Sequence, residues 1–249
     1  MLKALIATVM MSQVTGPLSA QSIAQRIGGV ADGTVRLSFA ARQGVCSQGS
    51  NGISIGHSSE EWQPDCRPRL VRVALRLADR TVQSIRTYVG GEWIPDPRAI
   101  DLGTVSAPEA ARYFIAIAQD TGAKTSADDL LLPVVLADSI TVWPSLVKIA
   151  RSHRASQELR GRAVFWLGQA AGEAAGLALD SIAGDDRGDR EVRKQAIFAL
   201  SQRSTDEAVP ALIRIARTND DPELRKTALF WLGQSEDPRA VTLFEEILK

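Results

Sequence analysis

The sequence has little of what most enzymes use for catalysis. It contains two histidines and two cysteines among 249 residues, and the histidines, His57 and His153, stand far apart in the chain. It has no glycine-rich phosphate loop and no His-x-x-x-His or Cys-x-x-Cys pair. We therefore expect no cofactor, no metal ion and no catalysis.

An excess of charge of either sign is also missing. Lysine plus arginine and aspartate plus glutamate number 29 each, so the chain has no net charge to attract nucleic acid or anionic lipid. The hydrophobic fraction is 45%, an ordinary value for a globular protein, so we expect a folded chain that does not bind nucleic acid.

Long apolar runs are absent as well. The longest near the N-terminus, 4–11, has eight residues, whereas a membrane-spanning helix needs about 20. Lys3 precedes this run, and Leu18-Ser19-Ala20 offers a small residue for cleavage before Gln21. The pattern predicts a signal peptide over 1–20, export to the periplasm or beyond, and no membrane insertion after its removal; the alternative is a buried N-terminal helix.

The two cysteines flank a segment rich in glycine. In an exported chain Cys46 and Cys66 would meet an oxidising environment, so we predict a disulfide, which closes a loop of this size with about 3 kcal/mol of stabilisation. The alternatives are a thiol pair or a metal site completed by His57. His57 with Glu60 and Glu61 is also the one candidate acid/base cluster in this loop.

Residues 21–97 are predicted to form a small antiparallel β region. Apolar and polar residues alternate over 34–39 and 70–77, and a turn at 78–80 leads into a further strand over 81–89. One face of this hairpin is apolar and needs a cover, and the other carries arginine and serine. Residues 93–102 contain two prolines and no period, which predicts a linker.

A linking helix is expected to open the second region, 104–249. Ser106 and Glu109 have the spacing of a capping box, and apolar residues at helical spacing carry the helix to about Asp120. This helix would cover the sheet or begin a helical stack.

Three segments of the second region repeat one pattern. They are LRGRAVFWLGQ from Leu159, VRKQAIFALSQ from Val192 and LRKTALFWLGQ from Leu224, at offsets of 33 and 32 residues. Each is followed by a second apolar helical pattern, and an earlier, poorer copy extends the series to four helix pairs from about residue 126. Asp221-Pro222 and Asp237-Pro238 are typical helix starts, and Gly168 and Gly233 are predicted to end helices in the left-handed conformation.

These segments resemble HEAT repeats, including the short bacterial type named after phycobilisome lyases. The resemblance covers about residues 126–249, and the whole chain resembles exported bacterial proteins that carry such an array behind a short β region. It implies an α+β protein whose C-terminal α-solenoid binds other proteins. It also implies that the repeated arginines, Arg160, Arg193 and Arg225, hold neighbouring turns together, with Asp189 and Asp221 within local reach; the alternative is an anion-binding ladder.

Three phenylalanines recur at one repeat position and form what we call the phenylalanine row: Phe165, Phe198 and Phe230. At 100° per residue they point far from the face of the helix that carries the core leucines. We therefore take them as candidate partner-binding residues, for an unknown protein or another copy of the chain. The alternative is that wide helix contacts or the β region bury them.

Three functions follow, in this order of preference. The first is a non-catalytic scaffold that binds proteins through the repeats. The second is a β region that binds a small ligand or a wall glycan, with the array as support. The third is a lyase-like enzyme, which is disfavoured because the repeats contain His153 but no other histidine or cysteine.

Overall fold

The structure is a computed structural model that describes residues 21–47, 53–55, 70–120, 125–170 and 172–248. The predicted signal peptide at 1–20 and the loop residues Cys66, His57, Glu60 and Glu61 lie outside the described residues. The disulfide and the signal peptide therefore stay predictions.

The β region contains a short helix and a four-stranded sheet. In chain order its elements are α1 (Ile23–Gly28), β1 (Gly33–Ala40), β2 (Val45–Ser47), β3 (Ile53–Ile55), β4 (Leu70–Ala78), β5 (Thr81–Val89) and β6 (Ala99–Thr104). The sheet has the order β5-β4-β1-β6, and β2 pairs with β3 in a separate hairpin. The predicted hairpin is confirmed, because Asp79 and Arg80 make its two-residue turn with φ of 50° and 58°, as a tight turn between twisted strands requires.

The linker predicted over 93–102 is wrong in its second half. Residues 99–104 form β6, which pairs with β1 in parallel and so makes the sheet mixed. Two features hide this strand in the sequence: it lies at the edge of the sheet with a half-exposed face, and its register with β1 shifts between Arg36 and Ser38.

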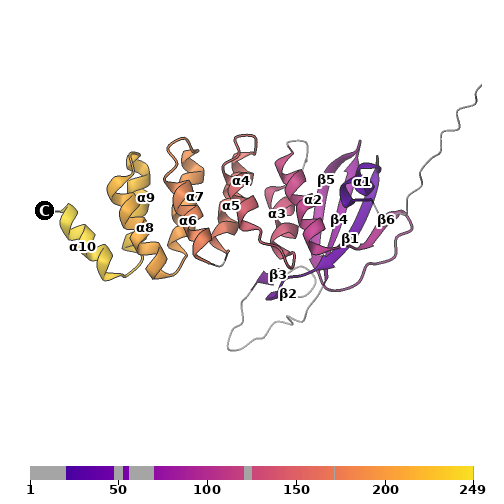
Figure 1. Cartoon of the computed structure of the whole chain (residues 1–249), viewed down its shortest axis with the longest axis horizontal. Coiled ribbons are helices and arrows are strands. Elements are labelled where there is room, and N and C mark those ends of the chain that lie inside the picture. Colours follow the sequence, from indigo (N-terminus) through magenta and orange to yellow (C-terminus); the bar gives the residue numbers. More distant parts are fainter. Residues whose placement is uncertain (1–20, 48–52, 56–69, 121–124, 171, 249) are drawn as a thin grey trace, which may run out of the picture.

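Nine helices follow the sheet in the described chain. They are α2 (Ala107–Gln119), α3 (Ala127–Leu136), α4 (Trp143–Ala150), α5 (Gln157–Gly168), α6 (Glu173–Ala183), α7 (Arg190–Ser201), α8 (Thr205–Thr218), α9 (Pro222–Gly233) and α10 (Pro238–Ile247). They extend in a row from the sheet to the C-terminus (Figure 1). The four predicted helix pairs are α3–α4, α5–α6, α7–α8 and α9–α10.

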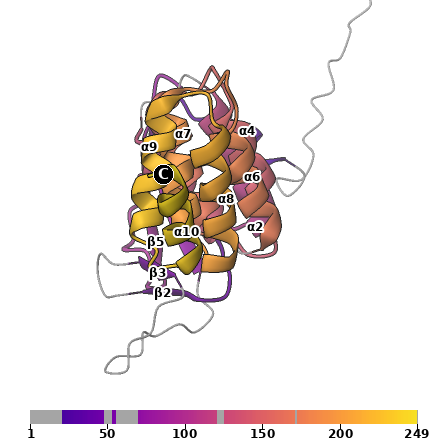
Figure 2. The same ribbon diagram turned by 90° about the vertical axis from the view of Figure 1, so that its left-hand side faces the viewer.

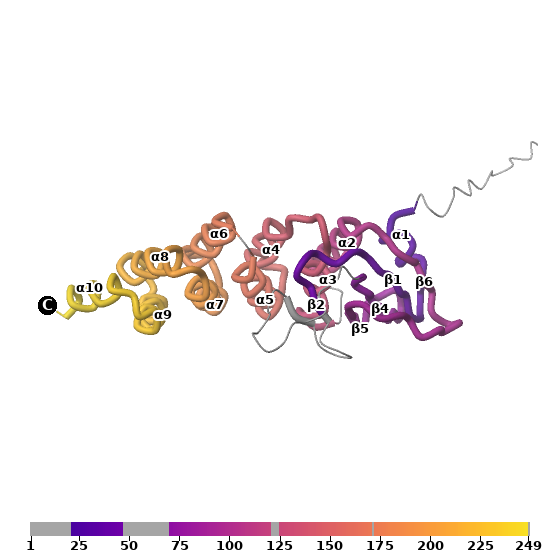
Figure 3. The backbone as a smooth tube through the Cα atoms, turned by 90° about the horizontal axis from the view of Figure 1, so that it is seen from below, coloured from indigo at the N-terminus to yellow at the C-terminus, as the bar shows by residue number. Residues whose placement is uncertain are grey.

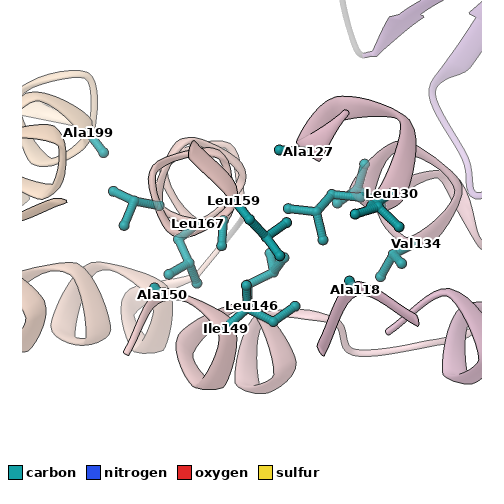
Figure 4. Close-up of a cluster of buried hydrophobic side chains, with 14 of the residues drawn as sticks. Ala118, Ala127, Leu130, Val134, Leu146, Ile149, Ala150, Leu159, Leu167 and Ala199 are labelled. Atoms are coloured by element: carbon teal, nitrogen blue, oxygen red, sulfur yellow. The ribbon is translucent and has the colours of Figure 1, made fainter. Parts of the chain in front are cut away.

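The helices form two layers. The first helices of the pairs, α3, α5, α7 and α9, stack on one another, and α2 joins α4, α6, α8 and α10 in the other layer (Figures 2 and 3). A helix pair alone cannot bury its apolar stripe, and stacking lets each pair cover the next. Figure 4 shows this between α3, α4 and α5, where Leu130, Leu146 and Leu159 meet.

The sheet closes the first end of the array. Its apolar face, with Val35, Leu37 and Phe39 fully buried, packs against α2 and α3, so that one hydrophobic core continues from the sheet into the repeats. Backbone bonds add to this contact: Arg42 N–H donates to Leu136 O at 2.9 Å, next to a bridge between Ala41 and Ala137. The sheet thereby covers the apolar surface of the first helices, which would be exposed at the end of a free array.

Three helix ends differ from the prediction. Ser106 begins α2 without a side-chain cap bond, and Glu109 accepts the backbone N–H of Ile23 at 2.9 Å, which connects α2 to α1. Gly233 ends α9 without a left-handed φ. Gly168 ends α5 in the same way. A Cβ there would lie 3.1 Å from the Cβ of Ala199, so the glycine permits close packing of α5 on α7.

Other helix ends are as predicted. Asp221 begins α9 and accepts the backbone N–H of Glu223, and Asp237 begins α10 and accepts that of Arg239. A proline follows each aspartate at the first helical position, where its missing N–H costs nothing.

Candidate functional site

The phenylalanine row lies on the layer formed by α5, α7 and α9, one residue on each helix. Phe165 is 40% exposed, Phe198 is 41% exposed and Phe230 is 58% exposed. Neither helix packing nor the described part of the β region covers these rings. A line of half-exposed aromatic side chains on adjacent helices is uncommon on a surface that meets only water.

Tryptophans support the rings from the side. Trp166 meets Phe165 with 5.1 Å between ring centroids, and Trp231 meets both Phe230 and Phe198 at 5.0 Å. Both indoles are partly buried against the core, so they fix the phenylalanines in position. The rings are therefore held in place while one side of each stays open to solvent.

A glutamine accompanies each phenylalanine. Gln169, Gln202 and Gln234 follow the three phenylalanines by four residues, at the C-caps of α5, α7 and α9, and all three are exposed. Residues four apart lie on one face of a helix, so each repeat presents an aromatic ring beside an amide. An amide side chain can both donate and accept hydrogen bonds, which suits contact with another polypeptide backbone.

The repeated arginines are placed between turns. Arg193 is 5% exposed and donates to Ala183 O at 3.0 Å, to Asp186 at 3.2 Å and to Asn219 at 3.3 Å. The equivalent Arg225 donates to the carbonyl oxygen of Asn219 at 2.7 Å. These bonds join the loop before α7 to the loop before α9.

The aspartates do not act locally as predicted. Asp189 accepts from Arg160 of the preceding repeat at 3.1 Å, and Asp221 accepts from Arg190 of its preceding repeat at 2.6 Å. The reason is that each aspartate also caps the helix that follows it, which turns its free oxygen toward the previous repeat. Each capping carboxylate thus connects two repeats.

Sequence reasoning missed one surface, on the outer face of the sheet. Arg36 of β1 and Arg86 of β5 both pair with Ala74 of β4, one on each side. Arg72 and Arg76 stand two residues before and after Ala74 on the same strand and face. The alternation of residues in the sequence indicates an arginine-rich face. That these arginines gather around one alanine depends on the register of three strands, which the alternation does not give.

No group of three or more His, Cys, Asp or Glu side chains in the described ranges could hold a metal ion. His153 lies in a narrow hollow beside Arg160 and Asp189.

One motif escaped the sequence analysis. Residues 52–56 read Gly-Ile-Ser-Ile-Gly, the spacing of a nucleophile elbow, which requires the serine at a sharp turn from strand to helix. Ser54 instead lies inside β3, where it pairs with Cys46 of β2. The structural context of a nucleophile elbow is therefore missing.

No helix in the part of the chain that the structure describes is long and apolar enough to cross a membrane. No curated protein matches the chain. A family profile of HEAT repeats matches residues 144–229 and again residues 178–249. These two overlapping ranges take in α5 to α10 and most of α4, and they show that this stack is built of HEAT repeats.

Proposed function

We propose that the chain is a non-catalytic platform that binds a partner protein through the phenylalanine row. HEAT repeats commonly mediate contacts between proteins, and a solenoid offers a long continuous surface for them. The observation that carries the proposal is that Phe165, Phe198 and Phe230 are 40%, 41% and 58% exposed on adjacent helices. Aromatic side chains dominate the energy of many interfaces, and each one buries about 150–250 Å² when it is fully enclosed.

The spacing of the row suggests the form of the partner. Packed helices lie about 8–10 Å apart, so neighbouring phenylalanines are about one helix spacing apart. A polyproline II chain advances about 3.1 Å per residue with three residues per turn, so every third side chain faces the same side at about that spacing. We therefore propose an extended segment whose apolar side chains contact the rings and whose backbone bonds to Gln169, Gln202 and Gln234.

Phe198→Ser tests the proposal because this residue is in the middle of the row. The matched control is Leu177→Ser, which removes a 62% exposed apolar side chain from α6 in the other layer. We expect capture of a partner from the cell envelope of the native host to fail with Phe198→Ser and to persist with Leu177→Ser. Urea denaturation of both variants verifies that they are folded.

The same variants separate the alternatives. Loss of a dimer with Phe198→Ser, seen by analytical ultracentrifugation, would identify a second copy as the occupant of the row. Unchanged capture and unchanged oligomer size would contradict a binding role. A large loss of stability with unchanged capture would mean that the row serves internal packing.

We further propose that the protein acts outside the cytoplasm. Support comes from Lys3, the apolar run 4–11 and Ala20, together with Cys46 and Cys66. N-terminal sequencing of protein from the native host is expected to begin at or near Gln21, and an intact Met1 would contradict export. Mass spectrometry of the same protein is expected to show a mass about 2 Da below that of the reduced form, as one disulfide requires.

A further inference from the structure

The outer face of the sheet has a hollow of about 630 Å³ whose floor is Ala74. Arg36 and Arg86 pair with Ala74 from the two neighbouring strands, so their Cα atoms are about 10 Å apart. Arg72 and Arg76 flank Ala74 along β4 on the same face. Three long cationic side chains, of Arg36, Arg76 and Arg86, line the hollow around the short one of Ala74, and Thr34, Ser84, Tyr88 and Trp93 complete the lining.

Two of these arginines are held by the segment that follows β5. Arg36 donates to Ile94 O at 2.8 Å, and its guanidinium carbon lies 4.8 Å from the centre of the Trp93 ring. Arg72 donates through Nε to Gly91 O at 2.9 Å. Their side chains are therefore ordered before any ligand arrives, which reduces the entropy that binding must remove.

The other two arginines have no partner in the described part of the chain. Arg76 and Arg86 are exposed and make no hydrogen bond or ion pair with the residues that the structure describes. In addition, Arg36 Nε and Trp93 Nε1 are buried N–H donors without an acceptor among those residues. These two donors have almost no accessible surface, so the groups open to a ligand are the exposed guanidinium groups of Arg76 and Arg86.

Carboxylates lie at and near the hollow, and one of them, Asp96, interacts electrostatically with Arg36. Asp32 lines one end, but its carboxylate accepts the backbone N–H of Asp79 at 3.1 Å. Asp101 of β6 lies opposite Arg36 of β1 in the sheet, and its carboxylate accepts the N–H of Gly103 at 2.8 Å. Three arginines and one aspartate line the hollow, so its lining is positively charged in a chain that is neutral as a whole.

We propose that this hollow binds a small soluble ligand through a phosphate or diphosphate group. Guanidinium groups match phosphate oxygens in two-bond contacts, and a diphosphate has enough charge and acceptors to engage several arginines at once. A neutral glycan fits less well: Tyr88 and Trp93 line the hollow and offer aromatic surface to a sugar ring, but three guanidinium groups there would keep their charge uncompensated. The site is separate from the phenylalanine row and independent of the function proposed for it.

Inorganic pyrophosphate is the probe, measured by isothermal titration calorimetry on the whole mature protein. Arg76→Gln and Arg86→Gln are each expected to weaken binding by about ten-fold or more, as the loss of a bond to a charged group does. Arg112→Gln is the matched control, because Arg112 is an exposed arginine on α2, outside the hollow. Equal weakening by the control would mean unspecific attraction by charge and would overturn the proposal.

A second variant tests the shape and leaves every charge in place. Ala74→Leu fills the floor of the hollow on the solvent side of the sheet and is expected to abolish binding. Retained binding in this variant, or no binding of pyrophosphate by the unchanged protein at about 1 mM, would overturn the proposal. So would binding only to phosphatidylglycerol vesicles in a flotation assay, since that would place the phosphate on a membrane.

Discussion

The ring of Phe198 on α7 lies 5.0 Å, centroid to centroid, from the indole of Trp231 on α9. This contact joins two repeats at their surface, because Phe198 is 41% exposed and Trp231 is partly buried. In α7 the position equivalent to Trp231 is Ala199, which lies against Gly168 of α5. The junction between α5 and α7 is therefore tight, and that between α7 and α9 is filled by an aromatic pair.

The aromatic pair predicts a measurable coupling. Phe198→Ala and Trp231→Ala should each lower the free energy of unfolding, and a double-mutant cycle should give a coupling of about 0.5–1.5 kcal/mol. Phe165 and Trp231 are on non-adjacent helices and form the control pair, with coupling near zero. Equal coupling in both pairs would contradict a direct contact.

Stacking predicts that position in the array governs the effect of a core deletion. Leu200 and Leu243 are both 2% exposed, but Leu200 lies mid-array and Leu243 is on the last helix. Leu200→Ala should cost about 2–5 kcal/mol of unfolding free energy. Leu243→Ala should cost less, because α10 has a neighbour on one side only. Urea denaturation decides this, and equal losses would argue against a stacked array.

Removal of the buried Arg193 should lower the free energy of unfolding more than removal of the exposed Arg190. Arg193→Ala removes the buried donor shared by the Asn219 amide oxygen and the Ala183 carbonyl, which keep only one other bond each, and this should cost about 2–4 kcal/mol. Arg190→Ala removes a partly exposed ion pair to Asp221 and should cost about 1 kcal/mol or less. Thermal denaturation of the two variants measures both losses of unfolding free energy. Similar losses would mean that Arg193 stabilises the fold no more than a surface contact does.

The cap of α10 predicts an acid-sensitive end of the array. The side chain of Arg239 and then its backbone N–H donate to Asp237 and lower the pKa of this carboxyl from 3.8 to about 2. The cap therefore contributes fully above pH 3.8, and its contribution is lost as the pH falls through about 2. An NMR titration of the carboxyl carbon should show this pKa, and Arg239→Gln should move it back toward its ordinary value. An unchanged pKa in the variant would contradict the assigned cause.

The repeats could be predicted from the sequence because each carries its own signals. Leu159, Val192 and Leu224 begin the same pattern, and an error in one copy is corrected by the other two. The hairpin was equally plain, since alternation and a short turn are local properties. Where a feature depends on one segment alone, as β6 does, the sequence gives far less information.

What the sequence could not provide depends on contacts between distant segments. Glu109 has the local spacing of a capping box, yet it binds Ile23, which is 86 residues away. The hollow above Ala74 needs the register of β1, β4 and β5, and alternation alone does not fix which residues face each other across strands. The exposure of the phenylalanine row likewise depends on how closely neighbouring helices pack.

The most direct test of the proposed platform presents the protein with a library of random peptides on phage. We predict enrichment of peptides with apolar residues about three positions apart, the spacing that matches adjacent helices. These peptides should lose binding to Phe198→Ser and keep it with Leu177→Ser. Failure to enrich any peptide, or equal binding to the Phe198→Ser protein, would contradict the claim that this row is a protein-binding surface.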